Sequence, residues 1–141
     1  MIFTFGTFTL DVDTEKTEEL YGNAPLITET CSCEGCSNYV HAARLFPPEV
    51  KTFFRSLGID PEKAAEVYLL YSDDKEKKAA YGGFYHLCGK ILEGVTDGSE
   101  RYTVCDGYRV HFTDDISLPE EGLNEPAVQM EIDFARVPYV Y

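Results

Sequence analysis

The chain has 141 residues, 44% of them hydrophobic and 13% aromatic, which is enough apolar material for a single folded domain over residues 1–141 and excludes a disordered chain. Its formal net charge of −13 repels phosphate backbones and anionic lipid surfaces, so neither nucleic acid nor a membrane is expected as a partner. An excess of carboxylates typically keeps a small protein soluble, and the alternative is that it faces a basic protein partner. The sequence does not indicate an oligomeric state.

No stretch of the chain has the length and hydropathy of a membrane span, and the first residues lack the basic and apolar segments of a signal peptide. We therefore expect a cytoplasmic protein. In a reducing compartment, the odd number of five cysteines favours thiols or metal ligands over a disulfide framework.

The N-terminal segment, residues 3–12, alternates apolar and polar residues, which predicts a β-strand. The alternation changes phase at Gly6, and a β-bulge at Gly6-Thr7 would return both halves of the strand to one face. Residues 13–23 are acidic and weakly patterned, so we expect a loop or a short helical turn there.

Two helices are predicted next. Ser37 or Asn38 caps the first, which ends at Phe46 because two prolines follow. The second covers residues 48–57, and Gly58 stands where a left-handed helix terminator belongs. Its apolar residues recur with helical spacing: Val50, Phe53, Phe54 and Leu57.

A long β-hairpin follows the helices. Residues 66–71 are rich in strand-forming side chains, a charged loop comes after them, and residues 80–92 form the second arm. One continuous helix over residues 61–80 is the alternative, which Gly82-Gly83 and the aromatic residues after them disfavour.

The C-terminal third predicts three further strands. Asp106-Gly107 is a strong signal for a two-residue hairpin turn between residues 102–105 and 108–112. The last strand alternates between a core face and a water face, and its core face comprises Val128, Met130, Ile132 and Phe134. The whole chain therefore predicts an α+β fold, with a mostly antiparallel sheet of about six strands and two helices inserted after the first strand.

The main chemical signal is the segment Cys31-Ser32-Cys33-Glu34-Gly35-Cys36, which places three of the five cysteines within six positions. Thiolates at this spacing can converge on one soft metal ion, and we expect zinc. Gly35 is expected to form the flexible corner between the last two thiols.

A closed tetrahedral zinc site needs a fourth ligand. His86 and Cys88 share one face of the predicted strand 80–92, while the other face resembles core, so we expect the cysteine segment to cover the side of His86 and Cys88. Cys88 would complete a four-thiolate site, and His86 would give three thiolates and an imidazole.

Two alternatives to a metal site remain open. In the first, the cysteines are buried and unligated, as free cysteines often are. In the second, Cys33 and Cys36 form a thiol redox pair, with Cys36 near a helix N-terminus, which favours the thiolate. Against this, such a pair normally lies between a strand and a helix of a parallel sheet, which the sequence does not predict.

The other polar residues form no catalytic pattern. We expect His41 and His111 at the surface and Cys105 as a buried or half-buried spectator. Acidic pairs such as Glu120-Glu121 lie in predicted loops, where carboxylates are normally solvated. The sequence has neither a hydrolase nucleophile motif nor a glycine-rich phosphate loop, and we expect no enzymatic activity.

Three segments, residues 31–39, 54–61 and 82–89, together resemble a family of small uncharacterised proteins of gut Firmicutes. The resemblance covers most of the chain and implies a bacterial, intracellular setting, but no activity. The first expectation is therefore a non-catalytic binding or adaptor domain with a structural zinc site. The alternatives are a thiol redox protein and an acidic interaction domain, of the inhibitor or immunity type, that holds no metal.

Overall fold

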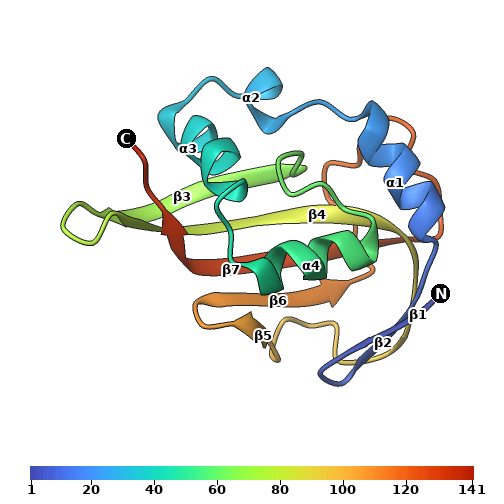
Figure 1. Cartoon of the computed structure of the whole chain (residues 1–141). Coiled ribbons are helices and arrows are strands. Elements are labelled where there is room, and N and C mark those ends of the chain that lie inside the picture. Colours follow the sequence, from blue (N-terminus) through green and yellow to red (C-terminus); the bar gives the residue numbers. More distant parts are fainter.

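The computed structural model describes residues 1–141 and shows an α+β fold with four helices and one seven-stranded sheet (Figure 1). Every strand pair is antiparallel. In chain order the elements are β1 (Ile2–Phe5), β2 (Phe8–Val12), α1 (Thr14–Asn23), α2 (Ile27–Thr30), α3 (Glu34–Ala43), α4 (Pro48–Leu57), β3 (Glu66–Asp73), β4 (Lys78–Glu93), β5 (Tyr102–Cys105), β6 (Tyr108–Thr113) and β7 (Ala127–Pro138).

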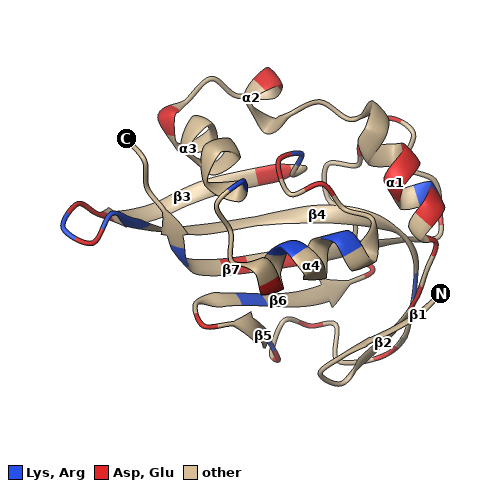
Figure 2. Ribbon diagram, in the orientation of Figure 1, with Lys and Arg blue, Asp and Glu red and all other residues tan.

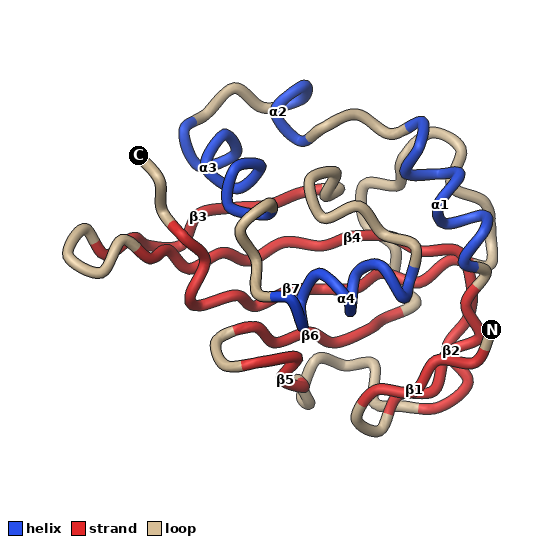
Figure 3. The backbone as a smooth tube through the Cα atoms, in the orientation of Figure 1, coloured by secondary structure: helices blue, strands red, loops and turns tan.

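Strand β4 organises the sheet because it is long enough to pair with three others (Figure 3). It pairs with β7 along one edge, while on the other edge β3 pairs with its first half and β2 with its last residues. The strand order is β1-β2-β4-β7-β6-β5, with β3 beside β4. Residues 79–89 of β4 are all buried, so both faces of this strand are covered.

The N-terminal segment is a β-hairpin and not the bulged single strand predicted from the sequence. Gly6 and Thr7 form its turn, Phe5 pairs with Phe8, and Gly6 has a φ of +59°. A two-residue turn reverses the chain and changes the phase of the alternation just as a bulge does, so the pattern alone did not distinguish them.

Residues 14–23 form helix α1, where the sequence predicted a loop or a short turn. The Asp13 side chain caps the helix by accepting the backbone N–H of Lys16 at 3.1 Å. Tyr21 attaches α1 to the sheet, because its hydroxyl donates to the carbonyl of His86 at 2.7 Å. Only three residues of α1 are buried, which explains the weak pattern: Thr17, Leu20 and Tyr21.

Both predicted helices are present, together with a single turn, α2. Helix α3 begins at Glu34 with Cys33 as its N-cap, four or five residues before the predicted cap, and it ends at Ala43, before the predicted end at Phe46. Helix α4 ends at Gly58, which is left-handed with a φ of +81°, and this confirms the predicted terminator.

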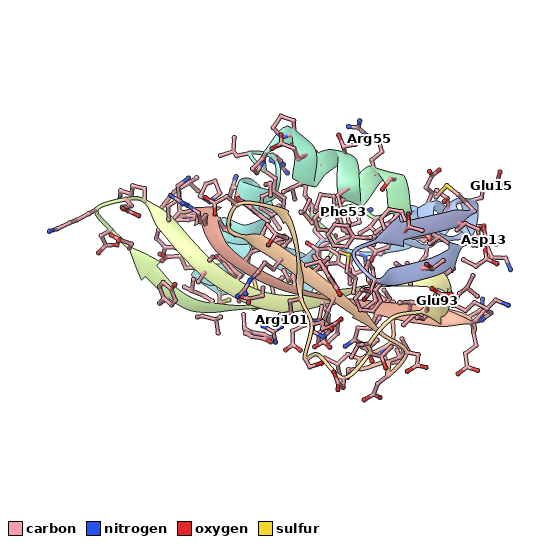
Figure 4. The ribbon with its side chains drawn as sticks, turned by 90° about the horizontal axis from the view of Figure 1, so that it is seen from below. Asp13, Glu15, Phe53, Arg55, Glu93 and Arg101 are labelled. Atoms are coloured by element: carbon pink, nitrogen blue, oxygen red, sulfur yellow. The ribbon has the colours of Figure 1, made fainter.

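The helices pack on one face of the sheet around an aromatic core (Figures 1 and 4). Phe53 of α4 points toward the β1–β2 hairpin, where its ring centre lies 5.7 Å from that of Phe3 and 5.0 Å from that of Phe5. Arg55, two residues later, points away from the protein. The α4 face predicted from helical spacing is therefore the buried one.

The later hairpins and the last strand confirm the sequence prediction, with one exception. In β7 the predicted core residues are buried, but Gln129 on the supposed water face is only 3% exposed. Residues 114–126 cover that face, since the backbone N–H of Ser117 donates to Gln129 Oε1 at 2.8 Å. None of the helices is both long and apolar enough to cross a membrane.

Candidate metal centre

Cys31, Cys33 and Cys36 gather where α2 leads into α3. Cys31 is the C-cap of α2, Cys33 is the N-cap of α3, and Cys36 lies in the first turn of α3. Their three sulfurs lie within 4.8 Å of one another, which is close enough to hold one metal ion. This part of the sequence prediction is confirmed.

Cys33 is the acceptor at the centre of the group. The Cys31 thiol donates to Cys33 Sγ at 3.1 Å, and the backbone N–H of Cys36 donates to the same sulfur at 3.4 Å. These donors lower the pKa of the Cys33 thiol, the contact from Cys31 most of all. Burial raises the pKa of the Cys36 thiol, which is contrary to the expectation that the helix N-terminus would activate it.

The start of α3 is held by hydrogen bonds from the core. Tyr81 of β4 donates its hydroxyl to the carbonyl of Gly35 at 2.7 Å. Asn38 donates to Tyr81 Oη at 3.1 Å and to the carbonyl of Pro138 at 3.0 Å, and it accepts the N–H of Val140 at 2.8 Å. These contacts fix the thiol-bearing turn against the sheet.

Gly35 serves the site by its small size and not as a flexible corner. It is part of helix α3 and has no left-handed backbone. A methyl group at this position would lie 3.3 Å from Leu69 Cβ of β3 and 3.9 Å from Cys33 Sγ. Glycine therefore lets the helix approach β3 closely.

His86 and Cys88, the residues expected to supply a fourth ligand, do not belong to the group of three thiols. The hydroxyls of Tyr81 and Tyr85 donate to the backbone carbonyls of Gly35 and Pro61, on the side of the sheet that the helices cover. His86 and Cys88 alternate with these tyrosines along β4 and therefore lie on its opposite face. The cysteine segment therefore lies over the tyrosine face of β4. The error was to assign that segment to the wrong face, because both faces of β4 are buried and the sequence does not distinguish them.

His86 is fully buried and has hydrogen-bond partners of its own. Its Nδ1 lies 2.6 Å from Glu120 Oε2 and its Nε2 lies 3.0 Å from Gln129 Oε1. Glu120 was expected as a solvated loop residue, and nothing in its local sequence indicates this contact. The group formed by His86, Glu120 and Gln129 joins residues 114–126 to the sheet, and we call it the His86 group.

Cys88 is buried and contributes to the lining of a cavity of about 880 Å³. Its backbone N–H donates to Thr17 Oγ1 at 3.0 Å, and burial raises the pKa of its thiol. The cavity lies beside α1, and Figure 4 labels two of its acidic residues, Asp13 and Glu15.

The remaining candidates are divided between surface and interior. His41 is exposed and Cys105 is half-buried, as expected. His111 is buried, contrary to expectation, and its Nε2 lies 3.1 Å from Oε2 of Glu131, its cross-strand partner on β7. The sequence interpretation missed this pair because the partner is twenty positions away.

No family model, no curated protein and no solved structure matches the chain, so comparison with known proteins places it in no family.

Proposed function

We propose that Cys31, Cys33 and Cys36 bind zinc and that the metal has a structural role in a non-catalytic binding domain. The observation that carries this proposal is the convergence of the three sulfurs within 4.8 Å on a turn held by the core. Thiolate sulfur is a preferred ligand of zinc, which has no redox chemistry of its own. In a reducing cytoplasm, the setting we propose, these thiols would stay available for the metal.

The location of the group supports a structural role. Residues 31–33 between α2 and α3, and the first two residues of α3, are exposed or half-buried, so little apolar burial holds this link in place. A metal ion that joins the end of α2 to the start of α3 would add the missing constraint. The positive end of the α3 dipole favours the negative charge that three thiolates bring.

A basic protein is the partner that fits the surface of such a domain. Acidic residues mark α1, the ends of α2 and α3 and several loops, and they exceed basic residues by 25 to 12 in the chain (Figure 2). Oppositely charged surfaces attract each other before contact, which increases the rate of association.

Metal analysis tests the zinc proposal directly. Protein purified without added zinc should contain about one zinc per chain, and Cys33→Ser should remove it while Cys105→Ser, at a half-buried site outside the group, should retain it. A metal-free wild-type protein that gains no stability on addition of zinc would overturn the proposal.

A thiol redox protein is the second candidate, and the contact between Cys31 and Cys33 favours it. Their sulfurs are 3.1 Å apart, and Cys33 is exposed with a lowered pKa. These residues, more than Cys33 and Cys36, would form the disulfide, since burial raises the pKa of the Cys36 thiol. A redox role requires that both thiols oxidise reversibly in glutathione buffers at cytosolic potentials, and full reduction under those conditions would exclude it.

A further inference from the structure

The group of three thiols is one ligand short of a closed zinc site. Tetrahedral structural zinc has four protein ligands, and no other His, Cys, Asp or Glu of the chain joins the group. Glu34, which lies between the cysteines in sequence, accepts a hydrogen bond from the Tyr139 hydroxyl. The missing ligand therefore has to come from outside the chain.

The group is open on one side only. Cys36 is 3% exposed and faces the core, Cys31 is half-buried, and Cys33 is exposed. An external ligand would approach from the side of Cys33, which is also the side of the solvent-exposed face of α3. The chemistry of that face decides which ligand fits.

Helix α3 has a narrow exposed stripe that carries a histidine. Within α3 and its C-cap, the residues that are not buried, Gly35 apart, follow helical spacing: Glu34, Ser37, His41 and Arg44. His41 is the one exposed histidine of the chain, since His86 is 0% and His111 is 5% exposed. The Tyr141 ring centre is 6.1 Å from that of His41, and Tyr141 and its neighbour Val140 are each 49% exposed.

The charges along this exposed stripe are complementary to those of a second copy of the stripe that runs antiparallel to it. Its N-terminal end is acidic at Glu34, and its C-terminal end carries His41 and Arg44. Two copies of α3 placed antiparallel about a two-fold axis near Ser37 would bring the acidic end of each against the basic end of the other. Cys33 and His41 are each four positions from Ser37, so the same axis brings His41 of one copy to Cys33 of the other.

We propose, building on the zinc site proposed above, that His41 of a second copy of the chain supplies the fourth ligand. Two zinc ions then bridge a symmetric dimer, each held by Cys31, Cys33 and Cys36 of one copy and by His41 of the other. A neutral imidazole suits this position, because zinc with three thiolates already has a net negative charge and the chain is acidic. The exposed side chains of Val140 and Tyr141 would be covered by the second copy in this dimer.

Zinc is essential to this dimer because two chains of charge −13 repel each other. Sedimentation of the full chain with one equivalent of zinc should give a dimer with two zinc ions, and a chelator should return it to monomer. His41→Ala should stay monomeric with zinc and bind it at least ~10-fold more weakly, because loss of a ligand costs more than loss of a ligand's hydrogen-bond partner. Thr52→Ala, at an exposed site on α4, is the matched control and should behave as wild type.

A rescue variant and a cobalt spectrum separate this inference from the zinc proposal on which it rests. His41→Cys offers another zinc ligand at the same point and should restore the zinc-dependent dimer. In the dimer, Co²⁺ should show the bands of a tetrahedral site with three sulfur ligands and one nitrogen ligand, and His41→Ala should change them. If the chain binds no metal, the zinc proposal fails. If it binds one zinc through three thiolates but stays monomeric, and His41→Ala has no effect, the zinc proposal stands and this inference is wrong.

Discussion

The His86 group and the three-cysteine group are both clusters of polar side chains, but they differ in whether the chain satisfies them. Both ring nitrogens of His86 have partners within 3.0 Å, and Thr14 Oγ1 is the single buried side-chain nitrogen or oxygen without one. The three-cysteine group, in contrast, is open to solvent at Cys33, and only weak hydrogen bonds to Cys33 Sγ, from the Cys31 thiol and the Cys36 backbone N–H, connect its members. Polar groups satisfied within the fold stabilise it, and donors left free at the surface can bind something else.

The largest expected effect is unfolding of the protein at alkaline pH, caused by ionisation of its buried tyrosines. Burial raises the pKa of Tyr81 to about 12 and raises those of Tyr39 and Tyr85 as well. The unfolded chain ionises its tyrosines near pH ~10, so stability is complete below that pH and is lost as the pH rises toward the folded values. Circular dichroism against pH should show one cooperative loss of structure above about pH 11.

The same titration followed by tyrosinate absorbance provides the check. The buried tyrosines Tyr39, Tyr81 and Tyr85 should ionise together with unfolding. Ionisation of all ten tyrosines near the ordinary pKa without loss of structure would contradict the prediction.

His86→Ala should have the next largest effect and lower the free energy of unfolding by about 3 kcal/mol. The substitution leaves a cavity, removes the partner of Glu120, and leaves the buried Gln129 side chain with one hydrogen bond fewer. Urea unfolding followed by circular dichroism measures the change. His41→Ala, studied without zinc, is the control and should change stability by less than about 0.5 kcal/mol, because His41 is exposed.

Zinc should stabilise the chain by about 2.7 kcal/mol when its free concentration is a hundred times the dissociation constant. Cys33→Ser should lose this increment while it retains most of the metal-free stability, because Cys33 is exposed. Cys88→Ser should keep the increment, because Cys88 is outside the group. Thermal unfolding with zinc and with a chelator compares the three proteins, and loss of the increment in Cys88→Ser would show that the two regions are coupled.

The smallest effect should appear in alkylation of the metal-free, reduced protein. Cys33 should react several-fold faster than Cys105 near pH 7, since its lowered pKa increases the thiolate fraction while burial raises the pKa of Cys105. Mass spectrometry of peptides after short exposure to iodoacetamide at several pH values measures both rates. Equal rates, or a faster Cys88, would contradict the hydrogen bonding described for Cys33.

Local patterns predicted much of the fold. The spacing of Val50, Phe53, Phe54 and Leu57 predicted α4, and Asp106-Gly107 predicted the turn between β5 and β6, because helical periodicity and turn chemistry are properties of neighbouring residues. Helix α1 was missed because its few buried residues give a weak pattern. The bulge at Gly6 was wrong because a bulge and a tight turn change the alternation in the same way.

The sequence by itself determined that three thiols would meet, because Cys31, Cys33 and Cys36 are so close along the chain that one extended link and one helical turn bring their sulfurs together. Only the tertiary structure decided what lies near them. Which face of β4 the α3 helix covers depends on contacts between distant residues, such as Tyr81 with Gly35 and His86 with Glu120, and the two faces of a fully buried strand have the same hydrophobic pattern. The packing therefore separated His86 and Cys88 from the thiols and left His41 exposed on the helix that carries them.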